Sequence, residues 1–257
     1  MHELPLLIFT LFLQGSVGVT LWLVFGGAHA SQRSALLPAA GAFVLASLGL
    51  LASALHMGYP LNALNALRHV SSSWLSREII FASLYLAALG LATLLMFAKK
   101  PGWKLLLAAA GLVGLVDVFC MAQIYMHASV VTWQHINTLV LFIGSSACMA
   151  VGMRSRATLR AAVVIITLLV LVRLVMQPVW LADISAMDNT VVTFPHAPLQ
   201  MLQQLRTVHL LSWCVSVVGM LCFAAGGLKA ARGTMLLGSA LLIAGELMLR
   251  FVFFSIG

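Results

Sequence analysis

Charged residues are scarce in this sequence of 257 residues. Only 8% are Asp, Glu, Lys or Arg, whereas 62% are hydrophobic. A soluble globular chain carries about 25% charged residues, because its surface faces water. The scarcity argues against a soluble protein and indicates a chain surrounded by lipid. The net charge of +8 does not indicate nucleic-acid binding, because the basic residues lie in short clusters between apolar runs.

Paired cysteines and a basic leader are also missing. The four cysteines form no CxxC pair and all lie in or near apolar runs: Cys120, Cys148, Cys214 and Cys222. We therefore predict neither a disulfide nor an iron–sulfur cluster nor another metal site within this chain. The first three residues lack the basic region of a cleaved signal peptide, so we expect the first apolar run to remain as a membrane helix.

Long apolar runs make up most of the chain. About 20 apolar residues cross the hydrocarbon core as a helix, and a helix satisfies its own backbone hydrogen bonds. The sequence therefore predicts an all-α, polytopic membrane protein. No connection could bury a core alone, so residues 1–257 form one integral membrane domain. Eight transmembrane helices are predicted, at Pro5–Gly27, Leu36–His56, Ile79–Ala98, Leu105–His127, Ile136–Met153, Ala161–Leu181, Thr207–Leu228 and Thr234–Ile256.

The basic residues predict the orientation of these helices. Nine of the 14 Lys and Arg residues lie in the loops after the first, third, fifth and seventh segments. Lys and Arg are enriched in the cytoplasmic loops of membrane proteins. We therefore expect these four loops inside the cell and both termini outside.

Polar side chains in the predicted helices gather toward the outer leaflet. Arg173 and Gln177 lie four residues apart and share a helical face. Others lie at the outer end of a segment or between that end and mid-depth: Tyr125, Gln14, Glu246 and Arg250. Because polar groups inside a membrane are costly, their distribution predicts a pocket that opens part-way into the bilayer.

Each of these residues also has a purely structural interpretation. Glu246 and Arg250 form an i, i+4 pair that could neutralise itself, and Arg173 could bind backbone carbonyls. His127 and His209 could be interfacial residues with one end in water, and Asp117 could be a protonated packing residue. Their roles stay open at the level of sequence.

The stretch from Ala52 to Ile79 concentrates polar chemistry beside an apolar run. It contains His56 at a helix end, the turn-forming Gly58 and Pro60, and the acidic Glu78. An imidazole can accept a proton near neutral pH, which suits a histidine for general base catalysis.

These residues resemble the DmsC family, the membrane-anchor subunits of bacterial dimethyl sulfoxide reductases. The family pattern H-x-G-x-P, then Asn, then S-x-E-I is matched by His56, Gly58, Pro60, Asn65, Ser76, Glu78 and Ile79. The N-terminal "HELPLLIFTLFLQ", which includes Gln14, and the C-terminal "AGELMLRFVFF", which includes Glu246 and Arg250, are similar as well. Asn62 stands where the family often has Arg. The resemblance extends over nearly the whole chain.

The resemblance implies an anchor in the bacterial inner membrane that oxidises menaquinol to menaquinone and carries no haem. Electrons would pass to a four-cluster ferredoxin-like iron–sulfur subunit, and then to a molybdopterin catalytic subunit that reduces an S- or N-oxide. The chain would thus carry the quinol-oxidation site and not the terminal reduction. His56 would act as the base and Glu78 would pass the proton to the outer water. The expected quinol-binding residues are Gln14, His56, Gly58, Pro60, Asn65, Arg68, Tyr125, Arg173, Gln177, Glu246 and Arg250.

Two other functions are weighed against this one. An anchor containing haem b would need paired histidines on facing helices, usually at two depths, whereas seven of the eight histidines lie at or outside the outer leaflet. A transporter often shows inverted repeats and helices broken near the midplane, and the two halves show no matching Gly or Pro interruption. The terminal oxidant and the type of quinone are not specified by the sequence.

Overall fold

The computed structural model describes residues 4–26, 31–56, 65, 67–148, 156–187 and 198–256. Its regular elements are all helices, and no strand occurs in this part of the chain, which confirms the all-α prediction. Two predicted quinol-binding residues, Gly58 and Pro60, lie outside the described residues, and so does the side chain of His56.

Seven of the described helices are long and apolar enough to cross a membrane. They are α1 (Leu4–Gly26), α2 (Gln32–His56), α4 (Trp74–Phe97), α5 (Trp103–Met126), α7 (Arg156–Met187), α9 (Arg206–Lys229) and α10 (Arg232–Ile256). They coincide with seven predicted segments and make the chain a multi-pass membrane protein. A shorter apolar helix, α6 (Ile136–Cys148), falls in the remaining segment, and α8 (Pro198–Gln204) precedes α9. The count of eight spans and the location of the termini stay predictions.

Two of the long helices extend beyond a predicted bound by five residues or more. Helix α4 begins five residues earlier than predicted, because Ser73 has an extended backbone and its hydroxyl accepts a hydrogen bond from the backbone N–H of Ser76. Helix α7 continues past Pro178 to Met187. The early start of α4 places Glu78 in the second turn of the helix.

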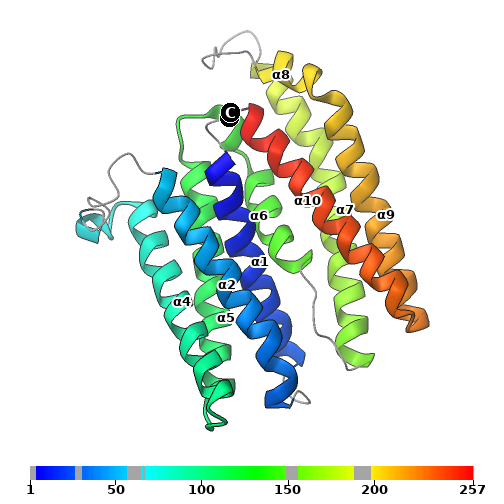
Figure 1. Ribbon diagram of the computed structural model, residues 1–257. Coiled ribbons are helices and arrows are strands. Elements are labelled where there is room, and N and C mark those ends of the chain that lie inside the picture. The colour runs from blue at the N-terminus through cyan, green and yellow to red at the C-terminus, as the bar shows by residue number, and fades with distance from the viewer. Residues whose placement is uncertain are drawn as a thin grey trace. The chain divides into compact units, whose positions relative to one another are not determined.

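The chain forms two compact units, which are described separately. The first unit comprises residues 1–124 and 145–159, and it contains α1, α2, α4 and most of α5 (Figure 1). Tyr85 of α4 is fully buried, and its hydroxyl is hydrogen-bonded to Ser16 at 2.6 Å and Thr20 at 2.9 Å, both in α1. Ser16 also donates to the carbonyl of Ala42 in α2 at 2.6 Å. These bonds join three helices of the unit in its interior.

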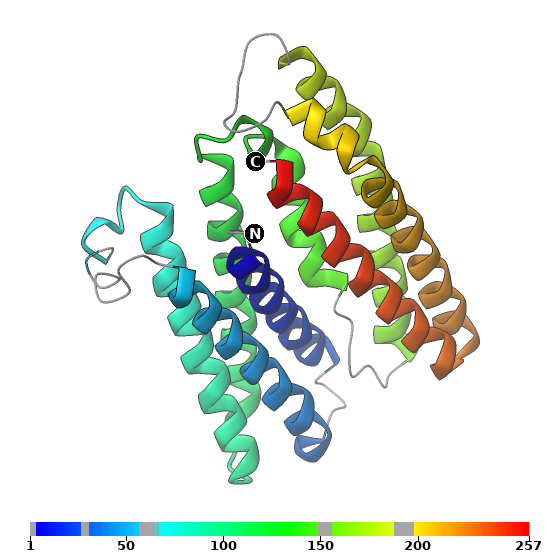
Figure 2. The same cartoon turned by 45° about the horizontal axis from the view of Figure 1, so that its top comes forward.

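The second unit comprises residues 125–144 and 160–257, and it contains α8, α9, α10 and most of α6 and α7. Helices α9 and α10 lie side by side in both views (Figures 1 and 2). They approach closely at glycines: a Cβ atom on Gly219 would lie 2.8 Å from the backbone N of Leu242, and one on Gly226 would lie 2.6 Å from that of Met235. Helices in lipid associate largely by van der Waals packing, which small residues permit. The tight hairpin holds the start of α9 beside the end of α10.

Candidate functional site

A partly open pocket lies in the second unit, among four of its helices. Its empty space is about 370 Å³, a volume that includes the open mouth. The lining residues are Asn137 and Leu141 of α6, Arg173, Gln177 and Trp180 of α7, His209 and Trp213 of α9, and Leu249, Val252 and Phe253 of α10.

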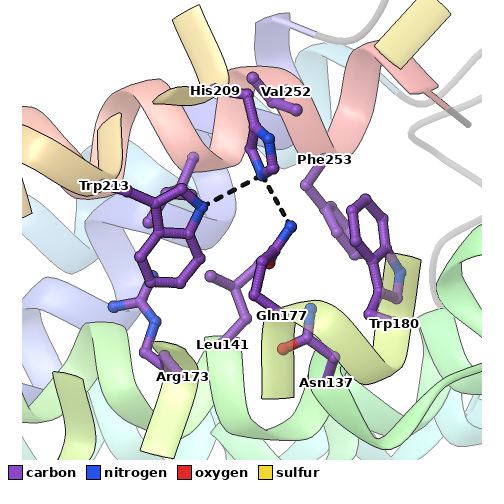
Figure 3. A pocket seen from close by; sticks show the side chains of 10 residues that line it. Asn137, Leu141, Arg173, Gln177, Trp180, His209, Trp213, Val252 and Phe253 are labelled. Carbon is purple, nitrogen blue, oxygen red and sulfur yellow. Dashed lines mark hydrogen bonds between the residues drawn. The ribbon is translucent and has the colours of Figure 1, made fainter. Parts of the chain in front are cut away.

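His209 is the centre of the hydrogen bonding in this pocket. Figure 3 shows the Gln177 amide pointing toward the imidazole, with Trp213 on the opposite side. The indole N–H of Trp213 lies 3.1 Å from Nε2 of His209, and the amide nitrogen of Gln177 lies 2.9 Å from the same atom. An indole N–H can only donate, so Nε2 must accept. The network therefore assigns a neutral imidazole whose proton is on Nδ1.

A buried cluster of charges adjoins the pocket. Arg173 of α7 forms an ion pair with Glu246 of α10, and both side chains are nearly inaccessible, at 2% and 1% exposure. Arg250 is fully buried with its guanidinium 3.7 Å from the centre of the Phe142 ring, and it interacts electrostatically with Glu246. The sequence suggested only the pairing of Glu246 with Arg250. The structure adds Arg173 from another helix, so the cluster has two positive groups and one negative group.

Tyr125 belongs to an aromatic cluster behind one wall of the pocket. Its ring lies 5.9 Å from that of Phe253, a lining residue, and 5.2 Å from that of Phe142. Trp133 stacks on Phe253 at 5.5 Å and donates its indole N–H to the carbonyl of Phe253 at 3.0 Å. These contacts hold the Phe253 ring in place. Tyr125 thus supports the wall and is not itself a lining residue.

The first unit contains two buried carboxyl groups. Glu78 of α4 is 5% exposed, and Asp117 of α5 is fully buried and interacts electrostatically with it. Neither carboxyl oxygen of Asp117 has a hydrogen-bond partner among the described residues. Ionisable groups at membrane depth are costly and are functional candidates by default. Glu78 lies near the start of α4, in the stretch where the resemblance implied proton transfer, whereas the role of Asp117 was left open by the sequence.

The remaining predicted residues are distributed over both units. In the first unit, the amide nitrogen of Gln14 donates to the Met121 sulfur at 3.1 Å, and Asn65 and Arg68 are exposed. Of the predicted set, the pocket in the second unit contains Arg173 and Gln177. No group of three or more His, Cys, Asp or Glu side chains suited to a metal ion occurs in the described parts of the chain.

Sequence reasoning missed several residues of the pocket. His209 was left without a role, and Asn137, Trp180 and Trp213 were not proposed as site residues. One signal was available: Trp213 follows His209 by four residues, which places both on one face of α9. Asn137 has no such signal, because its position in the pocket depends on how α6 packs against α7.

Comparisons with known proteins give the family of the chain. Residues 1–256 match the family model described as "DMSO reductase anchor subunit (DmsC)". Similar proteins include subunits named for anaerobic dimethyl sulfoxide reductases in two bacteria. The subunit from Escherichia coli is 36% identical over 157 residues, which cover 56% of this chain and 55% of the relative. The subunit from Haemophilus influenzae is 31% identical over 150 residues, which cover 54% and 52%.

These matches differ in extent. The chain spans about half the length of the curated relatives that it matches. No solved structure shows a significant match. The family model, in contrast, covers nearly every residue, including both ends and the stretch around His56 and Glu78. This polytopic helical chain, with its buried polar groups in both units, therefore belongs to the DMSO reductase anchor subunit (DmsC) family.

Proposed function

We propose that this chain anchors a dimethyl sulfoxide reductase in the bacterial inner membrane and oxidises menaquinol there. Its electrons pass to a four-cluster ferredoxin-like iron–sulfur subunit, and from there to a molybdopterin subunit that reduces the S- or N-oxide. Membership of the DmsC family and the names of the relatives support this assignment. The seven long apolar helices supply the membrane part.

The observation that carries the proposal is the buried Glu78 with its neighbour Asp117. Oxidation of a quinol to a quinone releases two electrons and two protons. The electrons leave through the iron–sulfur subunit, and the protons need acceptors in a region that excludes water. Glu78 is a carboxyl group with 5% exposure, and Asp117 lies within electrostatic range of it. Two buried carboxyl groups within electrostatic range of each other can each hold a proton released by the quinol.

His56 is the group that takes the first proton from the quinol hydroxyl. It is the last residue of α2, and it begins the H-x-G-x-P motif. An imidazole at this depth accepts a hydroxyl proton as a general base. Glu78 then receives the proton and releases it to the outer water. In this scheme Asp117, deeper in the first unit, holds the second proton.

The proposed topology places this chemistry on the periplasmic side. The loops after α1, α4 and α9 face the cytoplasm in this topology, because they contain Lys and Arg, which are enriched in cytoplasmic loops. Helix α6 contributes the eighth crossing, and both termini are periplasmic. Protons released near the outer ends of α2 and α4 therefore leave the cell interior.

The test is a pair of assays on one membrane preparation that contains the whole complex. We expect His56→Ala and Glu78→Gln each to lower menaquinol-analogue oxidation by roughly 10²-fold or more, the contribution of a general acid or base. Oxide reduction with an artificial dye donor should be unchanged, because the dye bypasses the quinol. The matched controls are His69→Ala, a nearby exposed histidine, and Asp183→Asn, an exposed carboxylate. Quinol activity that survives in His56→Ala would exclude it as the base.

A further inference from the structure

Aromatic rings and apolar side chains form the walls of the pocket in the second unit. Trp180 and Phe253 lie on one side of His209, and Trp213 lies on the other (Figure 3). The ring of Trp180 lies 6.3 Å from that of His209, and Trp213 lies at the same distance. Aromatic walls offer large flat contact surfaces with preferred stacking geometries. Such a pocket fits a flat ring better than an acyl chain.

Two amide side chains give this pocket unused hydrogen-bonding capacity. Gln177 directs its amide nitrogen at His209, so its amide oxygen is the group left to accept a further hydrogen bond. The side-chain amide of Asn137 has no hydrogen-bond partner within the described residues, so it can both donate and accept. A ligand that satisfies both amides needs hydroxyl or carbonyl oxygens on its ring, since a hydroxyl donates and a carbonyl accepts.

The charge of the lining favours a neutral ligand. Arg173 is the charged residue among those that line the pocket, and its guanidinium is paired with Glu246. His209 is neutral in the observed network, because two donors contact Nε2. Arg250, the excess positive group of the adjoining cluster, is not among the lining residues. A phosphate or carboxylate in the pocket would therefore lose its water shell and meet only the paired Arg173, and that loss is costly.

We propose that this pocket binds the neutral ring of a membrane quinone or quinol, with Asn137 and Gln177 as its hydrogen-bonding residues. The lining contains neither His56 nor Glu78, so the second unit has a ring site built from residues outside the oxidation motif. The identity of the ligand rests on the proposed function, which makes a quinone the substrate of the chain. The site places the ring against the side chains of Trp180 and Trp213, and no redox step is assigned to it.

The experiment measures binding without turnover. Menadione, the naphthoquinone ring without an isoprenoid tail, is titrated into the purified complex while tryptophan fluorescence is recorded. We expect Asn137→Leu and Gln177→Leu each to raise the Kd of menadione about tenfold, since a lost hydrogen bond of typical strength has that effect. Gln203→Leu, an exposed residue of α8, is the matched control and should leave the Kd unchanged. Dye-driven oxide reduction at the wild-type rate establishes that each variant is assembled.

Tryptophan variants locate the ring. Trp180→Phe should remove part of the quenching, whereas Trp103→Phe, at the start of α5, should not. Wild-type Kd values in both amide variants would overturn the proposal, and so would loss of all menadione binding in His56→Ala. The proposed function is judged separately, by quinol turnover in His56→Ala. If His56→Ala keeps its quinol turnover, the proposed function is refuted. The Kd of menadione in Asn137→Leu still decides whether the pocket binds the ring.

Discussion

The ion pair between Arg173 and Glu246 permits a quantitative prediction about stability. Both side chains are almost fully buried, and Arg250 lies close enough to interact with Glu246 as well. The substitution Glu246→Gln keeps the size of the side chain and removes its negative charge. The buried cluster then has two positive groups and no negative one. We expect the variant to be strongly destabilised.

The expected magnitude follows from the burial of both partners. Removal of one partner from a buried ion pair costs about 3–5 kcal/mol, because the other charge is left uncompensated. A more exposed contact of the same unit provides a control: Nε2 of His135 lies 3.0 Å from a carboxylate oxygen of Asp183, whose side chain is 51% exposed. Exposed pairs contribute about 0–1 kcal/mol. Asp183→Asn, the equivalent acid-to-amide change, should therefore cost less than about 1 kcal/mol.

The assay is SDS-induced unfolding of the purified chain in mixed micelles, followed by circular dichroism. A double variant, Arg173→Met with Glu246→Gln, separates lost charge from lost packing. It should recover part of the stability, since one uncompensated cation is removed, but not all of it, because Arg250 still loses Glu246. Equal free energies of unfolding for Glu246→Gln and Asp183→Asn would refute the reasoning, as would a double variant less stable than Glu246→Gln alone.

Three further predictions test other parts of the molecule. Gly219→Ala should destabilise the α9–α10 hairpin by about 1–3 kcal/mol in the same unfolding assay, as overpacking does, whereas Gly41→Ala, where an added Cβ has nothing within 4 Å, should be neutral. Asp117→Asn should slow menaquinol-analogue oxidation while dye-driven oxide reduction persists, and full quinol activity would exclude Asp117 as a proton acceptor. In a cysteine-free background, a membrane-impermeant thiol reagent should label Glu3→Cys and spare Lys100→Cys in intact cells. The reverse labelling pattern would invert the topology.

Much of the helical framework could be predicted from the sequence, because a helix that crosses lipid must be apolar over about 20 residues. Seven predicted segments coincide with long apolar helices, since each contains enough apolar residues to cross the bilayer. Ends were harder to predict. Helix α4 starts at Trp74 because Ser73 caps it, and hydropathy alone does not register a cap. Membership of the family followed from short motifs at three places along the chain, and the family model confirms it.

The candidate site could be predicted only in part from the sequence, because its contacts join different helices. The i, i+4 spacing correctly placed Arg173 and Gln177 on one face of α7, and both line the pocket. The partners of these two residues, Glu246 and His209, come from other helices, and their contacts depend on helix rotation, which local spacing does not specify. The binding roles of the predicted residues are still predictions.

Helix α7 has a consequence for the bilayer itself. It contains 32 residues, which at 1.5 Å per residue give a length of about 48 Å. The hydrocarbon core is about 30 Å thick, so the helix must tilt or extend beyond it, and hydrophobic mismatch of this kind is relieved by tilting. Helix α7 carries Arg173, which pairs with Glu246, and Gln177, which contacts His209. Both partners belong to the glycine-packed hairpin of α9 and α10. We therefore expect a thinner membrane to increase the tilt of α7 and to load the contacts that α7 makes with Glu246 and His209.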